Sequence, residues 1–202
     1  MRTLMADVSE WQGKIDFAKM RAAGIDDVYI RVLDLAGGPI DDRFRENWIA
    51  SSFVAGLRRG AYVYWRPNYS TQAQYDALMV AFVGLDGGEL PLAVDVEESG
   101  GLSMTTVAAR LRSFLSLIEN GNGRRPIIYT SASKWGAIVG NPSWARAYRY
   151  FVAHYYTPIA VPNLPLPCSR LYAWQFSSTG DGPKYGASSK YIDLSWLYGD
   201  DA

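Results

Sequence analysis

The sequence has very little of the residues on which several protein classes depend. It contains one cysteine and one histidine in 202 residues. A single cysteine excludes an internal disulfide and a zinc site built on cysteines, and it fits synthesis in a reducing compartment. No run approaches the roughly 20 apolar residues that a membrane-spanning helix needs. The first residues carry one arginine and no apolar segment, so they do not predict a secretory signal.

An excess of charge of one sign is also missing. Lys and Arg total 20, Asp and Glu total 20, and the formal net charge is zero. A nucleic-acid partner held by broad electrostatics is therefore not expected. What the sequence does have is 49% hydrophobic and 14% aromatic residues, which is typical of a globular domain with one large core. Many of the aromatic residues have polar neighbours, and rings with polar rims suit the binding of sugars.

Short apolar runs alternate with amphipathic segments over most of the chain. Runs rich in β-branched and aromatic residues predict strands at 28–32, 60–64, 92–96, 126–129, 151–153 and 171–176. Apolar residues at helical spacing predict helices at 18–23, 44–54, 70–83 and 103–120. We expect the last of these helices to begin at the N-cap Ser103 and to stop at Gly121.

This alternation predicts parallel βαβ units, of which five fit before about residue 150. After that point Pro158, Pro162, Pro165 and Pro167 prevent a regular helix, and we expect a surface loop over 158–167. The last strands follow without a helix. The predicted fold class is α/β: a single modified TIM-like barrel with five β/α units followed by three mostly helix-free strands, and residues 1–202 form one domain.

Acidic residues stand at the ends of predicted strands, which is where parallel α/β barrels hold their active sites. Asp7 and Asp193 each follow a short apolar run, and Asp95 and Glu97 end the strand 92–96. Because alternate residues of a strand share a face, Asp95 and Glu97 look into the same space. Two carboxyl groups held close can supply one protonated acid and one ionised partner, as glycoside hydrolysis requires. The pattern alone leaves open two solvated acids, or an all-oxygen site for Mg²⁺ or Ca²⁺.

Other catalytic patterns find no support in the sequence. There is no Gly-x-Ser-x-Gly elbow, and Asp86-Gly87-Gly88 is not followed by the Gly-Lys-Ser of a phosphate-binding loop. The lone His154 is expected to be packed or hydrogen-bonded. Cys168 has no activating neighbour in the sequence, and we expect it to be inert.

Seven short motifs follow one another in a fixed order from about residue 7 to residue 196. They are Asp7–Gly13 with Ile15–Phe17; Asp41, Phe44 and Asn47 with Gly56-Leu57 and Gly60–Tyr62; Leu92–Glu97; Pro126–Thr130; Val152–Tyr155; Trp174–Phe176; and Ile192–Ser195. In this order they resemble the motifs of glycoside hydrolase family 25, the lysozymes first described from Chalaropsis. Each motif alone is weak, and the ordered set covers nearly the whole chain.

The resemblance implies a flattened barrel and hydrolysis of the β-1,4 bond between N-acetylmuramic acid and N-acetylglucosamine in peptidoglycan. It implies that Glu97 is the general acid. Asp95 would orient the 2-acetamido group of the substrate or act directly on the anomeric centre, and Asp7 and Asp193 would complete an acidic floor. No cofactor or metal is implied.

The resemblance also suggests which side chains bind the sugar. Tyr62, Tyr129, Trp174 and Tyr155 would line the subsites. The segment 65–69 follows directly on the second motif, and we expect Trp65 and Arg66 to form a subsite wall there. Arg66 would meet the lactyl or peptide carboxylates of the substrate, the alternative being a solvated loop arginine.

One residue departs from the family pattern. The second motif of the family usually reads Gly-x-Tyr-His-Phe, and Val63 stands here where the histidine is expected. By strand alternation Val63 faces away from Tyr62. We therefore expect a change in packing behind the site and no change in its chemistry.

The leading hypothesis is a monomeric muramidase whose partner is bacterial peptidoglycan, with no nucleic-acid partner and no insertion into a membrane. The lack of a secretory signal favours a phage endolysin, which stays in the host cytoplasm until it is released to the wall. The lack of wall-binding repeats predicts a bare catalytic enzyme or one module of a larger protein. The catalytic module of a secreted, extracellular bacterial enzyme is the alternative. A non-catalytic sugar-binding barrel and a hydrolase of another N-acetylated polysaccharide, such as chitin, remain as other functions.

Overall fold

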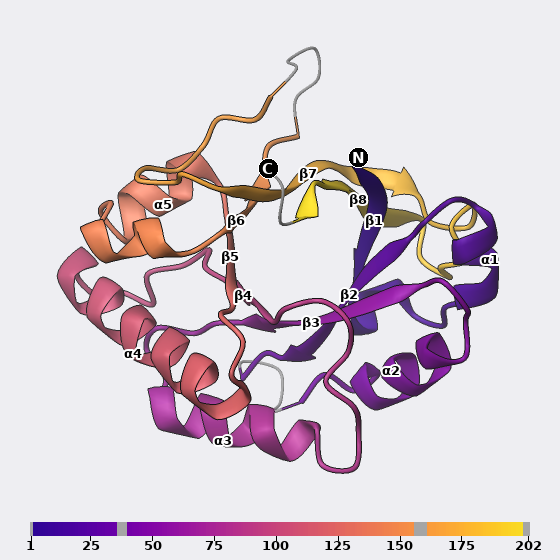
Figure 1. The fold of residues 1–202 in the computed structure, drawn as a ribbon, viewed down its shortest axis with the longest axis horizontal. Helices are drawn as coiled ribbons and strands as arrows, with labels where there is room; N and C mark the ends of the chain where they lie inside the picture. The colour runs from indigo at the N-terminus through magenta and orange to yellow at the C-terminus, as the bar shows by residue number, and fades with distance from the viewer. Residues whose placement is uncertain (1, 36–39, 156–160, 200–202) are drawn as a thin grey trace.

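Eight strands close into a barrel in the computed structural model, which describes residues 2–35, 40–155 and 161–199 (Figure 1). The strands are β1 Thr3–Val8, β2 Asp27–Leu33, β3 Arg58–Tyr64, β4 Ala93–Asp95, β5 Ile127–Thr130, β6 Tyr150–Ala153, β7 Leu171–Asp181 and β8 Tyr191–Leu197. Neighbouring strands from β1 to β7 are parallel. Strand β8 is antiparallel to both β7 and β1, and its pairing with β1 closes the barrel.

Each of the first five strands is followed by a helix on the outside of the barrel (Figure 1). The helices are α1 Phe17–Ala22, α2 Phe44–Ser52, α3 Thr71–Ala81, α4 Met104–Asn122 and α5 Ala132–Ile138, with short 3₁₀ turns η1 Glu10–Gln12 and η2 Ser143–Ala147. Residues 161–170, between β6 and β7, contain neither helix nor strand. The predicted order of five β/α units and three further strands is confirmed. Pro158 lies outside the described residues. None of the described helices is long and apolar enough to span a membrane.

Four of the five described α-helices begin where a side chain accepts from their first free N–H groups, and α2 is the exception. Asp16 caps α1, Ser70 caps α3, Ser103 caps α4 and Ser131 caps α5. The expected start of the long helix at Ser103 is therefore confirmed.

The end of α4 differs from the sequence-based expectation. The helix runs through Gly121 to Asn122 and stops at Gly123, which has a φ of 68°. Gly121 is needed for packing, because a Cβ there would lie 1.9 Å from the hydroxyl oxygen of Tyr75 on α3. Two glycines close together made the position of the cap ambiguous in the sequence.

Alternation along the strands separates two apolar layers. The interior of the barrel holds Met5, Tyr29, Ile127 and Phe151 among others. The layer between the barrel and its helices is larger and includes Val63, which is fully buried there. Val63 therefore packs behind the strand, as its position predicts, and the interior layer forms a floor beneath the polar residues described next.

Candidate active site

A cavity of about 260 Å³ lies at the barrel end where the parallel strands finish. Its lining includes all four carboxyl groups that the sequence singled out: Asp7, Asp95, Glu97 and Asp193. The described part of the chain thus brings together acids from three different strands and one loop.

The direction of β8 explains how Asp7 and Asp193 come to lie side by side. Asp7 in β1 and Asp193 in β8 are cross-strand partners in the register of the antiparallel pair. Asp193 lies near the beginning of β8, whereas the sequence placed it at a strand end. Because β8 runs opposite to its neighbours, its beginning reaches the same end of the barrel as the finish of β1.

The segment that carries the other two acids is held by β5. Asp95 is the last residue of β4, and Glu97 follows two residues later. Between them, the N–H of Val96 donates to the carbonyl of Tyr129, and the carbonyl of Val96 accepts from the hydroxyl of Thr130, both at 2.9 Å. These bonds continue the extended backbone beyond the strand, so both carboxyl groups face the cavity.

Gln175 in β7 organises one side of the cavity. Its Nε2 donates to both carboxylate oxygens of Asp7, at 3.1 and 2.9 Å. Its Oε1 accepts from the hydroxyl groups of Tyr129 and Tyr155, each at 2.7 Å. Sequence analysis did not single out Gln175, although it stands between two aromatic residues in one of the recognised motifs. Its amide joins an acid to two tyrosines, so it fixes their relative positions.

Burial and mutual repulsion make these acids hold their protons more tightly than free carboxyl groups. Burial raises the pKa of Asp7 well above its usual value, and Asp193 adds to the rise while Gln175 opposes it. Burial, then Glu97, raises the pKa of Asp95 well above its usual value. The same two causes raise the pKa of Asp193 to about 6. The site therefore retains carboxyl protons toward neutral pH, and such perturbation is typical of functional sites.

The two carboxyl groups of the Asp95–Glu97 pair have different surroundings. Asp95 is buried, and its Oδ1 has no hydrogen-bond partner among the described residues. Oε1 of Glu97 lies 3.0 Å from Nζ of Lys134, on α5, and the Glu97 side chain is 22% exposed. Sequence analysis did not find Lys134, because nothing local in the sequence places α5 beside the end of β4.

Tyrosines form the aromatic wall of the cavity. Tyr62, Tyr129 and Tyr155 all line it, as expected for sugar-binding residues. Burial raises the pKa of both Tyr62 and Tyr129 well above the usual value, so their hydroxyl groups stay protonated and can donate hydrogen bonds. Trp11 in η1 also lines the cavity, and its side chain is 73% exposed. Sequence analysis did not single out this exposed ring at the cavity edge.

Trp174 does not line this cavity and is a correction to the predicted subsites. It is buried, and its indole N–H donates to the carbonyl of His154 at 2.8 Å. Its ring contacts Phe176 with a centroid distance of 6.4 Å. Neighbouring residues of a strand face opposite sides, and here Gln175 takes the inward position. His154 is hydrogen-bonded, as expected, because its Nδ1 accepts from the N–H of Asn163 at 2.9 Å.

The expected subsite wall at residues 65–66 is also wrong. Trp65 is fully buried in the layer between barrel and helices. Arg66 contacts two acids outside the cavity: its Nε lies 2.9 Å from Asp34, and its Nη1 lies 2.7 Å from Glu98. Its guanidinium also lies 4.4 Å above the ring of Tyr64. These partners satisfy Arg66 within the protein, so it is neither a solvated loop arginine nor placed to bind the substrate.

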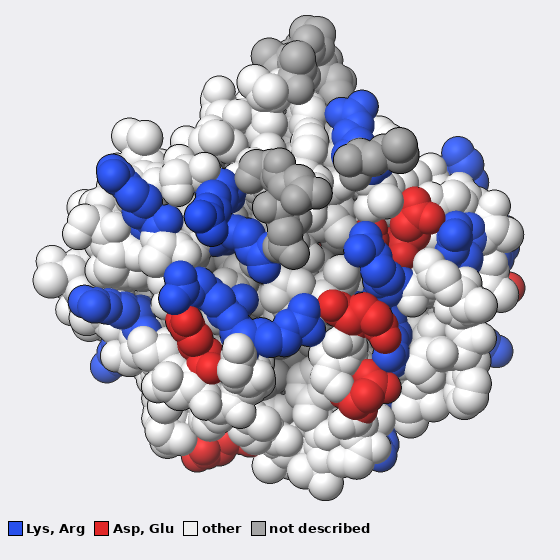
Figure 2. Space-filling model, viewed as in Figure 1, with Lys and Arg blue, Asp and Glu red and all other residues white. Residues whose placement is uncertain are grey.

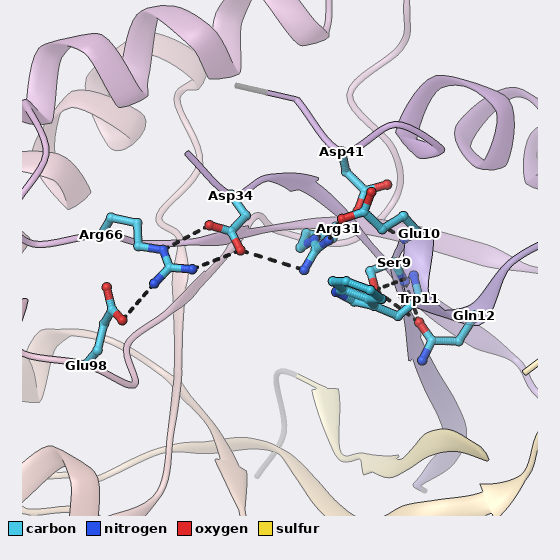
Figure 3. A network of polar contacts seen from close by, with 9 residues as sticks. All are labelled: Ser9, Glu10, Trp11, Gln12, Arg31, Asp34, Asp41, Arg66 and Glu98. Atoms are coloured by element: carbon cyan, nitrogen blue, oxygen red, sulfur yellow. Dashed lines mark hydrogen bonds and ion pairs between the residues drawn. The ribbon is translucent and has the colours of Figure 1, made fainter. Parts of the chain in front are cut away.

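Arg66 belongs to a polar network along the rim of the barrel (Figure 3). Arg31 in β2 lines the cavity and contacts Asp41 at 2.8 Å, Glu10 at 2.6 Å and Asp34 at 3.9 Å. Figure 3 shows the side chain of Trp11 beside Arg31. Because Glu10 precedes Trp11 directly, the network fixes the turn that carries this exposed ring.

The opposite end of the barrel has a different charge. Figure 2 looks onto the end at which β1 begins and β8 finishes, and Lys and Arg side chains gather across its middle. Arg58, Arg124 and Arg149 line a hollow there. Four acids thus line the cavity at one end of the barrel, and three arginines line a hollow at the other end.

The two remaining sequence questions concern a metal and the single thiol. Among the residues that the structure describes, no three His, Cys, Asp or Glu side chains are placed to hold a metal ion. Cys168 is half-buried, and burial raises the pKa of its thiol. A raised pKa keeps the thiol protonated and therefore a poor nucleophile, in line with the expected inertness.

Comparisons with known proteins agree with this geometry. Lysozyme M1 of Streptomyces globisporus is 33% identical over 205 residues, which cover 96% of this chain and 67% of that protein. The N,O-diacetylmuramidase of Chalaropsis sp is 26% identical, covering 94% of this chain and 93% of that one. A solved bacterial lysozyme from Streptomyces coelicolor superposes with a TM-score of 0.82 at 28% identity, covering 98% and 93% of the two chains. The chain spans 55% of the length of another relative, the uncharacterized protein YegX of Escherichia coli K12.

A family model gives the assignment. The model described as glycosyl hydrolases family 25 matches residues 6–184, a range that contains Asp7, Asp95 and Glu97. The chain therefore belongs to family 25 of the glycosyl hydrolases.

Proposed function

We propose that this glycoside hydrolase is a muramidase, which cleaves the β-1,4 bond between N-acetylmuramic acid and N-acetylglucosamine in peptidoglycan. The observation that carries the proposal is the convergence of four carboxyl groups on one tyrosine-lined cavity in a member of family 25. The names of its relatives, lysozyme and N,O-diacetylmuramidase, support the same substrate.

Glu97 is the proton donor in this proposal. Its carboxyl group borders the cavity and remains partly open to solvent, so it can reach the oxygen of a sugar bond and later a water molecule. It gives its proton to the leaving oxygen as the glycosidic bond breaks. It then takes a proton from the water that replaces the leaving sugar.

Asp95 positions the 2-acetamido group. Its buried Oδ1 accepts no hydrogen bond from the described residues, so it can accept one from an N–H group of the substrate. Holding this N–H turns the acetamide oxygen toward the anomeric carbon. The oxygen bonds to that carbon while Glu97 protonates the leaving group, and water then opens the ring intermediate. Two displacements on one carbon retain the configuration.

Asp7 and Asp193 complete the site. Their raised pKa values mean that at least part of the pair is protonated toward neutral pH, where it can donate to the substrate hydroxyl groups. The ionised fraction stabilises positive charge that develops at the anomeric carbon. Gln175 keeps Asp7 in place through two hydrogen bonds.

The place of action in this proposal is the bacterial cell wall. The protein works there as a monomer, without a nucleic-acid partner and without entering the membrane. We take it to be an endolysin of phage origin that remains in the host cytoplasm until release. An extracellular bacterial enzyme is the second possibility, and the chemistry is the same for both.

The test is hydrolysis of purified peptidoglycan by wild type and by Glu97→Gln. We expect the wild type to clear a peptidoglycan suspension and release reducing ends, and we expect the variant to lose activity by a factor of about 10² or more. Circular dichroism controls for folding. A folded Glu97→Gln protein with full activity would exclude the assigned proton donor, and a wild type that binds the wall without releasing reducing ends would identify a sugar-binding barrel.

A further inference from the structure

The proposed substrate raises an electrostatic problem for this cavity. Peptidoglycan carries carboxylates on its lactyl or peptide arms, whereas the cavity is lined by four acids. Like charges repel, so binding of an anionic arm needs a cation at the cavity edge. Arg66, which the sequence suggested for this role, contacts Asp34 and Glu98 outside the cavity.

Arg31 is also poorly suited to bind a substrate carboxylate. It lines the cavity, but its side chain is only 8% exposed and contacts three carboxylates of the protein. Releasing it would leave the fully buried Asp41 carboxylate without its ion-pair partner, which is costly in a buried setting. Arg31 therefore stabilises the rim of the barrel through these ion pairs.

Lys134 has the properties that Arg31 lacks. Its backbone N–H is fixed in the first turn of α5 by the hydroxyl of Ser131, at 3.2 Å. Its side chain is 45% exposed, and Nζ lies 3.0 Å from Oε1 of Glu97. A lysine has a flexible stem and three donors on its ammonium group. Lys134 can therefore turn to a new anion without disturbing the fold.

We propose that Lys134 recognises a carboxylate of the lactyl or peptide arm of peptidoglycan, and that this change of partner frees Glu97 to act as the acid. The inference rests on the proposed muramidase function. It makes Lys134 a specificity residue that acts on the substrate and, through the ion pair, on Glu97.

The coupling follows from hydrogen-bond chemistry. An ammonium group only donates, so an oxygen that faces it must accept. While Oε1 of Glu97 accepts from Nζ of Lys134, only the other carboxyl oxygen, Oε2, can carry the proton for the leaving group. When a substrate carboxylate takes the ammonium, Oε1 loses this donor and can carry a proton itself. A neutral glycan gives no such exchange and leaves the ion pair in place.

The experiment compares two forms of one substrate. Soluble glycan strands with free peptide carboxylates are one form, and the same strands with those carboxylates converted to amides are the other. The proteins are wild type, Lys134→Gln, Lys134→Arg and the control Lys19→Gln, which removes an exposed lysine on α1. Release of reducing ends gives kcat and KM for each pair.

We expect wild type to prefer the carboxylate form and Lys134→Gln to lose that preference. The loss in kcat/KM on the carboxylate form should be about fivefold, the upper range for a half-exposed ion pair. On the amidated form Lys134→Gln should be at least as fast as wild type, because no ammonium group then faces Oε1 of Glu97. Lys134→Arg should restore most of the preference because it keeps the charge, and Lys19→Gln should behave as wild type.

Two results overturn the inference. One is an equal fall on both substrates in Lys134→Gln, which a purely structural role would give. The other is an unchanged preference in that variant. Both leave the muramidase function standing, since wild type still cleaves the strands. If wild type cleaves neither form, the proposed function fails and this inference fails with it.

Discussion

Replacement of Asp193 by asparagine should stabilise the protein at alkaline pH while it impairs activity. Burial and the neighbouring Glu97 raise the pKa of Asp193 from 3.8 to about 6. A carboxyl group whose pKa is higher in the folded state binds its proton more tightly there than in the unfolded chain. Its contribution to stability is therefore complete below pH 3.8 and is lost as the pH rises through about 6.

The magnitude follows from the same two values. The rise in pKa corresponds to about 3 kcal/mol of stability that wild type loses between acidic and alkaline pH. An asparagine is neutral at every pH and nearly the same size, so it avoids this loss. Asp193→Asn should then be more stable than wild type by up to about 3 kcal/mol at pH 8, and equal to it at pH 3.5.

Denaturant unfolding at a series of pH values measures this difference. The control is Asp42→Asn, which changes an exposed aspartate. For this control we expect the difference from wild type to stay close to zero at each pH. The reasoning is refuted if the stability difference between Asp193→Asn and wild type does not grow from pH 4 to pH 8, or if Asp193→Asn is no more stable than wild type at pH 8. Peptidoglycan hydrolysis by the same variant should fall, because Asp193 borders the proposed reaction centre.

Three further predictions test the site and the packing beneath it. Gln175→Leu removes both hydrogen bonds that Nε2 donates to Asp7, so the pKa of Asp7 should rise further and kcat should fall about tenfold. An unchanged kcat would show that Gln175 has no organising role. Gly60→Ala places a Cβ 2.5 Å from the buried ring of Tyr29 and should lower the free energy of unfolding by about 1–3 kcal/mol. The control Gly136→Ala, whose Cβ would have nothing within 4 Å, should be neutral or stabilising. Equal shifts of the melting temperature in the two variants would contradict this prediction. NMR of the first product should show the β anomer, and an α anomer would exclude retention.

The barrel and its acids were predictable because they depend on local patterns. Strand alternation and the prolines after residue 150 indicated the element order. The acids were found because a charged residue at the end of an apolar strand is unusual without a partner or a function. Only the position of Asp193 along its strand was misjudged, since the direction of β8 is not visible in its own sequence.

The binding residues were less predictable because they depend on direction and on distant partners. Trp174 and Gln175 are neighbours, and a single-residue register decides which one faces the cavity. Arg66 is paired with Asp34 and Glu98, which come from other loops. An aromatic or basic residue close to a catalytic motif in the sequence is therefore a candidate for substrate binding. The sequence does not say which of these candidates has a side chain that faces the cavity.

The pairing of β1 with β8 also determines when activity can arise during synthesis. Asp7 lies in β1, which is synthesised before the other strands of the barrel, yet its cross-strand partner Asp193 lies in β8, which follows them all. Contacts between such distant positions form late, because the whole intervening chain must be ordered before the ends can meet. A nascent chain that stops before β8 has an open sheet edge and lacks one of the four acids. A cell that makes this hydrolase is therefore exposed to its activity only once translation has passed β8. Hydrolysis appears as a step at that point instead of growing with the chain.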